Sequence, residues 1–489
     1  MNVEPPTRES VVAVDVGVGY PVLVTPGEFY LPAAQAGRAA QVLRELDSST
    51  QQIESWGPEG DFVAFRVGAE AVDAPAQHGL QAARDATPEA RRAVTTVAEV
   101  DALRRRGIEA APDHVFLSHS VSGFPMSGFP MSGFPMSGFP MSGFPMSGFP
   151  MSGFPMSGFP MSGFPAPGVD GFFAGGISLA QRGGRKQRVV RPGRTWPGSE
   201  QDPPTSTAEP ASDPGDPQPS YDSGGVSVLV LDTGLADDGL RPAGLTALTV
   251  DQADVADQPD ADGDQHLDVQ AGHGMFIAGL IGRLAPSCSV TVRRVLSSDG
   301  TGRERDLADR LHEYAGKVDI VNLSLGTYTP FYPRMIERAV RAVQLGIGEP
   351  QATGVPPRPA VVVASAGNDG TWLSPYPAAL ADVVSVGALG PDGPAPFSNY
   401  GPWVRACAPG TDIVSTFFQR FDGPTPGEAD DFHGWARWSG TSFAAPVVVA
   451  ALARRMMADG ITAAEAVERV IDAHGLLRLP MFGTVVNLI

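Results

Sequence analysis

Four side chains of the kinds used in acyl transfer stand where buried strands or helices are expected to begin or end. Asp232 and Asn368 each follow an apolar, β-branched run, while His273 and Ser442 each stand near the start of a predicted helix. A serine hydroxyl becomes a nucleophile when a neighbouring histidine takes its proton and a carboxylate orients that histidine. An amide side chain can bind the negative oxygen that then develops. Together the four residues predict acyl-transfer chemistry.

Each residue alone also has an ordinary structural interpretation. An aspartate after a strand often caps a turn, a serine before a helix is a common N-cap, and a lone Gly-His-Gly is usually a loop. The combination is more informative, because the chain supplies a carboxylate, an imidazole, an amide and a hydroxyl in the order Asp232, His273, Asn368, Ser442. A nucleotide-binding protein is disfavoured, since Asp232-Thr-Gly-Leu is not a glycine-rich phosphate loop.

The elements that must position these residues alternate between strands and helices. Apolar runs without period-two alternation cover Val226–Leu231, Ile320–Leu325 and Ala360–Ala364, and such runs suit parallel strands buried on both faces. Predicted helices lie between and after them, at 273–284, 306–315, 333–345, 441–458 and 463–473. This alternation predicts an α/β fold with a doubly wound, mostly parallel sheet, and reactive residues gather at the carboxyl ends of the strands of such a sheet.

Six ordered segments resemble those of the subtilases, the subtilisin-like serine proteases, between Val226 and about Leu488. The segments are Val-Leu-Asp232-Thr-Gly, Gly-His273-Gly-Met-Phe-Ile-Ala-Gly, Val-Asn-Leu-Ser324-Leu-Gly326, Ala-Ser-Ala-Gly-Asn368-Asp-Gly, Ala408-Pro-Gly-Thr-Asp-Ile-Val-Ser-Thr and Ser439-Gly-Thr-Ser442-Phe-Ala-Ala-Pro446. The chain departs from the family at Met275, where Thr is usual, and at Phe276, where His is frequent. Neither departure removes a catalytic group.

The resemblance implies a serine endopeptidase with Asp232, His273 and Ser442 as its triad and Asn368 completing the oxyanion hole. It also implies a subtilisin-like fold and protein or peptide substrates. A substrate would add as an extended strand to an exposed edge, with main-chain hydrogen bonds holding it. The residues expected to bind substrate are Ser324, Leu325, Gly326, Ala366 and Gly367. The alternative function is a catalytically silent fold of this family used for binding or as a scaffold.

Composition limits the remaining classes of function. The formal net charge is −19, which argues against nucleic acid as a partner because no overall positive field gathers phosphates. The only two cysteines, Cys288 and Cys407, exclude a disulfide framework, and we interpret them as two buried thiols or one isolated disulfide. No secretory signal and no span of about 18 apolar residues is found, so the default expectation is a cytoplasmic protein without a membrane span, with non-standard export as the alternative.

Low-complexity sequence divides the chain into three parts. Residues 1–119 predict a small α+β domain, residues 120–222 a long disordered linker, and residues 223–489 the catalytic domain. In the linker the pentad Met-Ser-Gly-Phe-Pro occurs nine times from Val121 to Pro165, with Val121 in place of the first Met. A proline every fifth residue forbids a continuous helix or a central strand. We interpret the repeat as a spacer, with weak self-association through its Phe and Met residues as the alternative.

Three further segments leave alternatives open. The family resemblance suggests that residues 9–119 act as a propeptide that inhibits its own catalytic domain, and the alternative is a separate recognition module. The basic cluster Arg182–Arg194 is either a processing site or a solvated part of the linker. Six aspartates between Asp254 and Asp268 indicate a solvated loop, a preference for basic substrates or a calcium site. The glycine spacing there disfavours an EF-hand, so we expect no required cofactor and identify no metal ligands.

Overall fold

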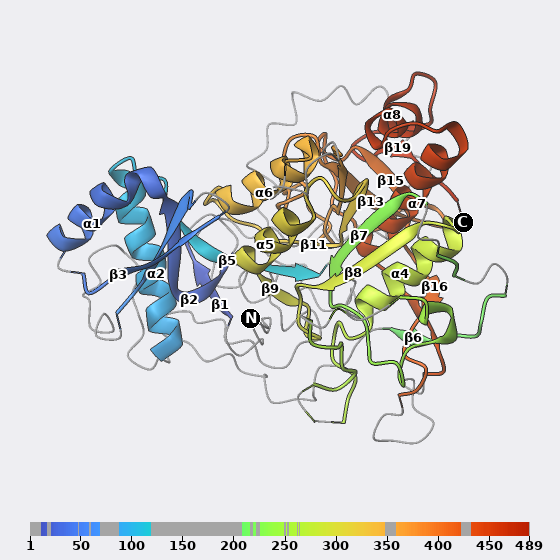
Figure 1. Ribbon diagram of the computed structural model, residues 1–489, viewed down its shortest axis with the longest axis horizontal. Coiled ribbons are helices and arrows are strands. Elements are labelled where there is room, and N and C mark those ends of the chain that lie inside the picture. Colours follow the sequence, from blue (N-terminus) through green and yellow to red (C-terminus); the bar gives the residue numbers. More distant parts are fainter. Residues whose placement is uncertain are drawn as a thin grey trace, which may run out of the picture.

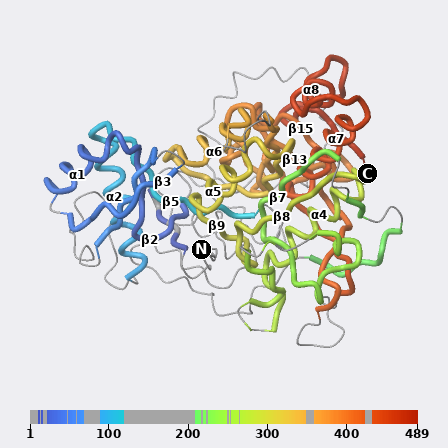
Figure 2. Tube along the Cα trace, in the orientation of Figure 1, coloured from blue at the N-terminus to red at the C-terminus, as the bar shows by residue number. Residues whose placement is uncertain are grey.

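The computed structural model of the 489-residue chain describes two folded parts that lie side by side (Figures 1 and 2). It describes residues 11–16, 21–46, 48–57, 60–68, 88–118, 208–215, 219–221, 225–248, 251, 254–261, 263, 265–347, 358–421 and 432–488. The pentad repeat and the basic cluster lie outside the described residues.

The first part is an antiparallel sheet with two helices packed on it. Its strands are β1 (Val12–Asp15), β2 (Pro21–Pro32), β3 (Gln51–Trp56), β4 (Phe62–Arg66) and β5 (Ala111–Ser118), and its helices are α1 (Ala36–Glu45), preceded by the 3₁₀ turn Ala33–Gln35, and α2 (Pro88–Arg105). The strand order is β5-β2-β4-β3, and β1 pairs with residues 21–24 at the N-terminal end of β2. The described residues of this part thus combine antiparallel strands with helices, and the domain bounds 1–119 stay a prediction.

Two strands of this part have little local signal in the sequence. Strand β2 continues to Pro32 through Thr25-Pro26-Gly27, residues that are typical of turns. It does so through a register shift between Val24 and Phe29, and Gly27 takes a positive φ of 91° there, which glycine adopts without strain. The sequence missed β3 altogether, because this edge strand is polar and mostly exposed.

The described residues of the second part include a sheet of nine strands. Parallel neighbours run in the order β8 (Ser289–Arg294), β7 (Ser227–Asp232), β10 (Ile320–Leu323), β12 (Val361–Ser365), β13 (Val384–Gly390), β15 (Ala406–Pro409) and β19 (Gly483–Val485), and β14 (Gly393–Pro394) and β18 (Arg478–Leu479) join it antiparallel. From β7 the chain goes first to β8 on one side and then returns to β10 on the other. The strand order therefore reverses at β7, which is where α/β sheets form their ligand crevice.

Both faces of this sheet are covered, as its continuous apolar strands require. Val228 and Val230 of β7 belong to one core cluster with helices α4 (His273–Leu284) and α7 (Thr441–Asp459). Leu229 and Leu231 belong to a second cluster with α5 (Glu304–Tyr314) and α6 (Arg334–Leu345). Alternate side chains of one strand thus face opposite helix layers, which confirms the α/β architecture. The chain then adds α8 (Ala463–Val467) and the π-helical turn Glu468–Asp472.

Helix α7 passes a length-and-composition test for a membrane span, but 78% of its most apolar window is buried inside the protein. It packs against α4 and against β12, β13 and β15 of the sheet. That burial is the property of a core helix. Cys288 and Cys407 are buried free thiols, as the first interpretation of the two cysteines predicted.

The last described residues of the predicted linker belong to the second fold. Strand β6 (Glu209–Pro210) pairs with β17 (Trp435–Trp438), which in turn pairs with β16 (Ile413–Thr416). Ala208 is buried, and the hydroxyl of Tyr221 donates a hydrogen bond to the carbonyl of Ala278 in α4. Ordered contacts of the second part therefore begin before residue 223.

The two parts are joined through β5, which runs out of the first sheet into the second part (Figure 1). There β5 lies between two short strands, β9 (Thr301–Arg303) and β11 (Leu325–Gly326), and pairs antiparallel with both. All eight residues of β5 are buried. Helices α5 and α6 share the second core cluster with the first sheet, so the contact extends well beyond the strand.

Candidate active site

Asp232 and His273 form a buried pair at the carboxyl end of β7. The Nδ1 atom of His273 lies 2.7 Å from Oδ1 of Asp232, and neither side chain is exposed. The backbone N–H of Thr233 donates to the same carboxylate oxygen at 2.8 Å. The carboxylate therefore sets which ring nitrogen faces inward and leaves Nε2 to face the other way, as a general base requires.

Aromatic rings enclose the imidazole of His273. The ring of Trp438 meets it edge to face at a centroid distance of 5.4 Å, and the ring of Phe443 lies tilted at 5.2 Å. Both rings are buried. They exclude water from two sides of the imidazole and restrict its rotation, which strengthens its interaction with Asp232.

Glycines allow the chain segments around His273 to approach one another. Gly272 precedes the helix with φ of 79°, and a Cβ there would lie 2.4 Å from the ring of Phe417. A Cβ on Gly274 would lie 2.6 Å from the backbone oxygen of Gly234, in the turn after Asp232. Only glycine at these positions permits the close contact between the start of α4 and the end of β7.

Ser442 is the second residue of α7, and its side chain is fully buried. Its Oγ donates to the backbone oxygen of Ser324 at 3.1 Å, and the hydroxyl of Ser324 donates to the backbone oxygen of Ser442 at 2.9 Å. Among the described residues, Nε2 of His273 has no hydrogen-bond partner. The hydroxyl of Ser442 thus contacts the segment between β10 and β11, and it makes no hydrogen bond to His273.

Thr441 links Asn368 to the start of α7. The Oδ1 atom of Asn368 accepts hydrogen bonds from the backbone N–H of Thr441 at 2.9 Å and from its hydroxyl at 2.8 Å. The hydroxyl oxygen of Thr441 also accepts from the N–H of Gly367 at 3.1 Å. These bonds fix the carbonyl side of the Asn368 amide at the first residue of α7, next to Ser442 in the chain.

The predicted substrate edge is covered rather than exposed. Leu325 pairs with Ser118 and Gly326 pairs with Leu117, so strand β5 occupies the edge on which we expected a substrate to add. Ser324, Leu325, Gly326 and Ala366 are all buried. The physical reason is that an exposed edge offers unpaired N–H and C=O groups, and the chain's own strand satisfies them.

Ala366 and Gly367 follow β12, and a buried amide holds this turn. Asn399 donates to the carbonyl of Ala366 at 2.8 Å, and a Cβ on Gly367 would lie 2.4 Å from its amide nitrogen. Gly367 has φ of 100°. The sequence identified both residues, but it gave no signal for Asn399.

The aspartates between 254 and 268 do not form one solvated surface. The side chain of Asp254 is 5% exposed and its carboxylate contacts Arg293 and Arg310, and Asp257 is fully buried. Asp260 accepts from the N–H of Gln265 and Asp268 from that of Ala261. Asp262 and Asp264 lie outside the described residues. Among the residues that the structure describes, no group of three or more His, Cys, Asp or Glu side chains is placed to hold a metal ion.

The four residues predicted to react stay a prediction, and the sequence assigned no role to several residues that contact them. Thr233 and Thr441 stood in the quoted segments without an assigned role, and their position next to Asp232 and Ser442 was the available signal. The sequence offered no signal for Trp438 or Asp257, because an isolated tryptophan and one aspartate of an acidic run have many ordinary explanations.

Comparisons with known proteins agree on one family. The family model described as "Subtilase family" matches residues 223–473, just over half of the chain. A "Thermophilic serine proteinase" of Bacillus sp. (strain AK1) is 33% identical over 215 residues, which are 41% of this chain and 47% of that protein. "Subtilisin BL" of Lederbergia lenta is 34% identical over 194 residues, 37% of this chain and 62% of that protein. The chain thus spans about half the length of these curated relatives.

A solved structure titled as a cold adapted subtilisin-like serine proteinase aligns with 55% of this chain and 90% of its own. Its TM-score is 0.40 and its sequence identity 22%.

Proposed function

Because the chain belongs to the subtilase family, we propose that it is a serine endopeptidase that hydrolyses peptide bonds through an acyl-enzyme on Ser442. The observation that carries this proposal is the buried pair of Asp232 and His273 at 2.7 Å, beside the start of α7, to which Asn368 is bound. No catalytic group of the triad is substituted. Members of the family commonly bind calcium, and no ligand set for it is found in the described part of this chain.

The proposed reaction begins when His273 accepts the hydroxyl proton of Ser442 through Nε2. This needs a rotation of the hydroxyl away from the carbonyl of Ser324, to which it donates now. The Oγ atom then attacks the scissile carbonyl carbon, and the histidine gives the proton to the leaving amine. Asp232 keeps the imidazole in the required tautomer and stabilises the imidazolium. A water molecule releases the acyl group by the same proton transfers in reverse.

The developing oxyanion would be bound by the amide of Asn368 and the backbone N–H of Ser442. The carbonyl side of Asn368 is already held by Thr441, so the amide needs no reorganisation when charge develops. Ser442 stands in the first turn of α7, where the helix dipole also favours negative charge. Donors fixed in advance are usually the largest single contribution to such catalysis.

Substrates would bind as an extended strand between β9 and β11. Strand β5 illustrates the arrangement, because Phe116 pairs with Gly302 on one side and Leu117 pairs with Gly326 on the other. Main-chain bonds of this kind bind an extended peptide largely independently of its sequence. The class of substrate is therefore proteins and peptides.

We infer that residues 11–118 inhibit their own catalytic domain. An extended substrate and β5 would need the same hydrogen-bonding groups of β9 and β11, so the two exclude each other. Polar contacts hold the inhibiting part in place: Tyr30 and His114 both contact Glu304, and Nε1 of Trp56 donates to Asp309 at 2.7 Å. This pattern favours autoinhibition over a separate recognition module, because the fully buried strand β5 lies on the edge where a substrate would bind.

The test is labelling of the full chain by a fluorophosphonate probe, which reacts with activated serines. Three proteins are compared: the wild type, Ser442→Ala, and a His114→Ala/Phe116→Ala variant that changes only the inhibiting part. Labelling that requires Ser442 supports the peptidase, and faster labelling of the double variant supports autoinhibition. If neither protein with Ser442 is labelled, the alternative of a catalytically silent binding or scaffold protein gains support.

A further inference from the structure

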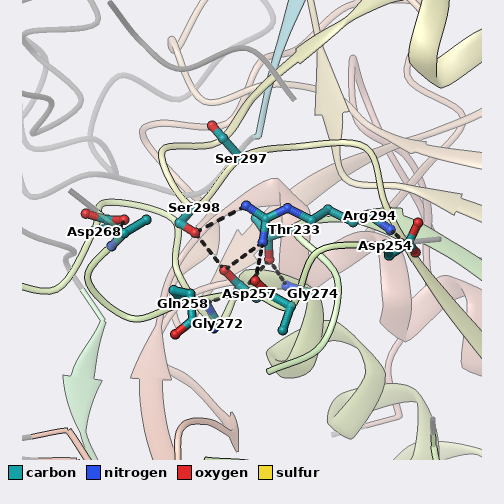
Figure 3. A network of polar contacts seen from close by, with 12 residues as sticks. Thr233, Asp254, Asp257, Gln258, Asp268, Gly272, Gly274, Arg294, Ser297 and Ser298 are labelled. Atoms are coloured by element: carbon teal, nitrogen blue, oxygen red, sulfur yellow. Dashed lines mark hydrogen bonds and ion pairs between the residues drawn. The ribbon is translucent and has the colours of Figure 1, made fainter. Parts of the chain in front are cut away.

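A second buried carboxylate, that of Asp257, lies between Thr233, Gly272 and Arg294 (Figure 3). Its Oδ2 atom accepts two hydrogen bonds of 2.8 Å, one from the hydroxyl of Thr233 and one from the backbone N–H of Gly272. Thr233 directly follows Asp232, and Gly272 directly precedes His273. A single oxygen atom thus connects the two segments that carry the pair.

Thr233 adds a second connection between the same segments. Its hydroxyl donates to Asp257 and accepts from the N–H of Gly274 at 3.0 Å. A hydroxyl has one proton, so the carboxylate fixes the direction of the O–H bond and leaves a lone pair for Gly274. The backbone N–H groups on both sides of His273 are therefore held by Asp257, directly or through Thr233.

The other carboxylate oxygen of Asp257 contacts the last residue of β8 and the loop that follows this strand. Oδ1 accepts from the hydroxyl of Ser298 at 3.0 Å, and Nη1 of Arg294 lies 3.8 Å away. Arg294 pairs in register with Asp232 across β8 and β7. Its guanidinium compensates a negative charge that would otherwise be buried without a counter-charge.

We propose that Asp257 is a positioning residue for the reaction, which acts through Thr233, Gly272 and Gly274 to hold His273 in hydrogen-bond contact with Asp232. This inference rests on the proposed peptidase function, and none of the motifs that identified the family includes Asp257. A displacement of about 1 Å in such a site can lower a rate about 10²-fold, which sets the expected size of the effect.

The ionisation of Asp257 gives the proposal a pH-dependent consequence. Burial raises the pKa of Asp257 to about 6, while Arg294 and the hydrogen bonds from Thr233, Gly272 and Ser298 lower it. The charged or titratable groups around it are Arg294 of β8, Asp254 of its own segment, Asp232 of β7 and His273 of α4. Protonation turns one oxygen of the Asp257 carboxylate into a hydrogen-bond donor. The hydrogen bonds that Asp257 accepts from Thr233 and Gly272 therefore weaken as pH falls through about 6.

The test compares Asp257→Ala with Asp254→Ala, a matched control. Asp254 is also an aspartate with a nearly buried side chain bound to arginines. Its printed contacts are with Arg293, the N–H of Arg294 and Arg310, and not with Thr233, Gly272 or Gly274. All variants carry His114→Ala/Phe116→Ala so that β5 obstructs the site less. We expect Asp257→Ala to lower kcat for a peptide substrate about 10²-fold with KM within about twofold, whereas Asp254→Ala lowers the thermal unfolding midpoint without lowering kcat.

Two further variants separate positioning from folding. Asp257→Asn keeps an oxygen that accepts from Thr233 and Gly272, so its kcat should be higher than that of the alanine variant. Because asparagine does not titrate, the decrease of kcat below about pH 6 that is due to Asp257 should disappear. Thr233→Val should lower kcat and leave KM unchanged. Unchanged kcat in Asp257→Ala, or an equal loss in Asp254→Ala, would overturn the proposal.

The Nδ1 proton resonance of His273 gives a readout that does not need turnover. We expect it to shift or broaden in Asp257→Ala and to stay in place in Asp254→Ala. If the parent protein hydrolyses no peptide, the proposed function fails, yet this resonance still decides whether Asp257 positions His273. An unchanged resonance in Asp257→Ala contradicts the inference.

Discussion

Oε2 of Glu304 lies 2.5 Å from Nδ1 of His114, although 190 residues separate the two, and both side chains are fully buried. The other oxygen of Glu304 accepts from the hydroxyl of Tyr30 at 2.7 Å and from the N–H of Ile336 at 3.1 Å. Glu304 thus holds the strand that covers the substrate edge and the start of α6 at the same time.

Replacing His114 by Ala should release this strand. The change leaves Oε2 of Glu304 buried with a hydrogen bond removed, which costs about 1–3 kcal/mol, and more for a charged group. We therefore expect about 10-fold faster labelling of Ser442 by a fluorophosphonate probe. The control is Glu109→Ala, which removes the exposed pair with Arg334 from the same contact and should change little. Equal labelling of both variants would contradict a special role of the His114–Glu304 contact.

The contact between the two parts should weaken as pH rises through about 7. Burial, and next the nearby Asp113 of β5, raise the pKa of Asp306 to about 7. A carboxyl whose pKa is raised on folding contributes stability below its ordinary pKa, and this contribution is lost as pH rises through the raised value. The free energy of unfolding of Ser442→Ala, measured in urea, should thus be lower at pH 8 than at pH 5.5. Asp306→Asn should flatten this difference, and an unchanged pH dependence would exclude Asp306 as its source.

Asn368→Ala should lower kcat about 10²- to 10³-fold with little change in KM, because it removes a donor to the oxyanion. Thr441→Val is the milder companion change. It removes one hydrogen bond to Oδ1 of Asn368, worth about 1 kcal/mol, and should cost about fivefold in kcat. Steady-state kinetics on one peptide substrate checks both. A higher KM with kcat unchanged would instead assign Asn368 to substrate binding.

Gly274→Ala should inactivate the protein, because its Cβ would lie 2.6 Å from the backbone oxygen of Gly234 and one of the two segments must move. That movement separates His273 from Asp232. Gly239→Ala is the matched control, since a Cβ there meets no atom within 4 Å. Circular dichroism checks that both variants fold, and probe labelling should be lost in the first variant alone. Full labelling of Gly274→Ala would show that the backbone adapts without consequence for the site.

The parallel sheet could be read from the sequence because its strands are buried on both faces. Runs such as Val228–Leu231 have no polar position, and this property belongs to the run itself. The polar edge strand β3 has no such property and was missed. The register shift within β2 has no local signal either, because Pro26 and Gly27 are typical turn residues. Helix α4 begins at His273 and ends at Leu284, the residues that the sequence predicted.

The sequence by itself determined the family, the α/β class and the four residues proposed for catalysis, because each stands beside its own strand or helix in a short local segment. Only the tertiary structure decided what holds and what covers them. Asp257 connects Thr233 with Gly272, and β5 fills the edge beside Gly326. These contacts join residues that are distant in the chain, and the long-range packing that creates them leaves no local pattern in the sequence.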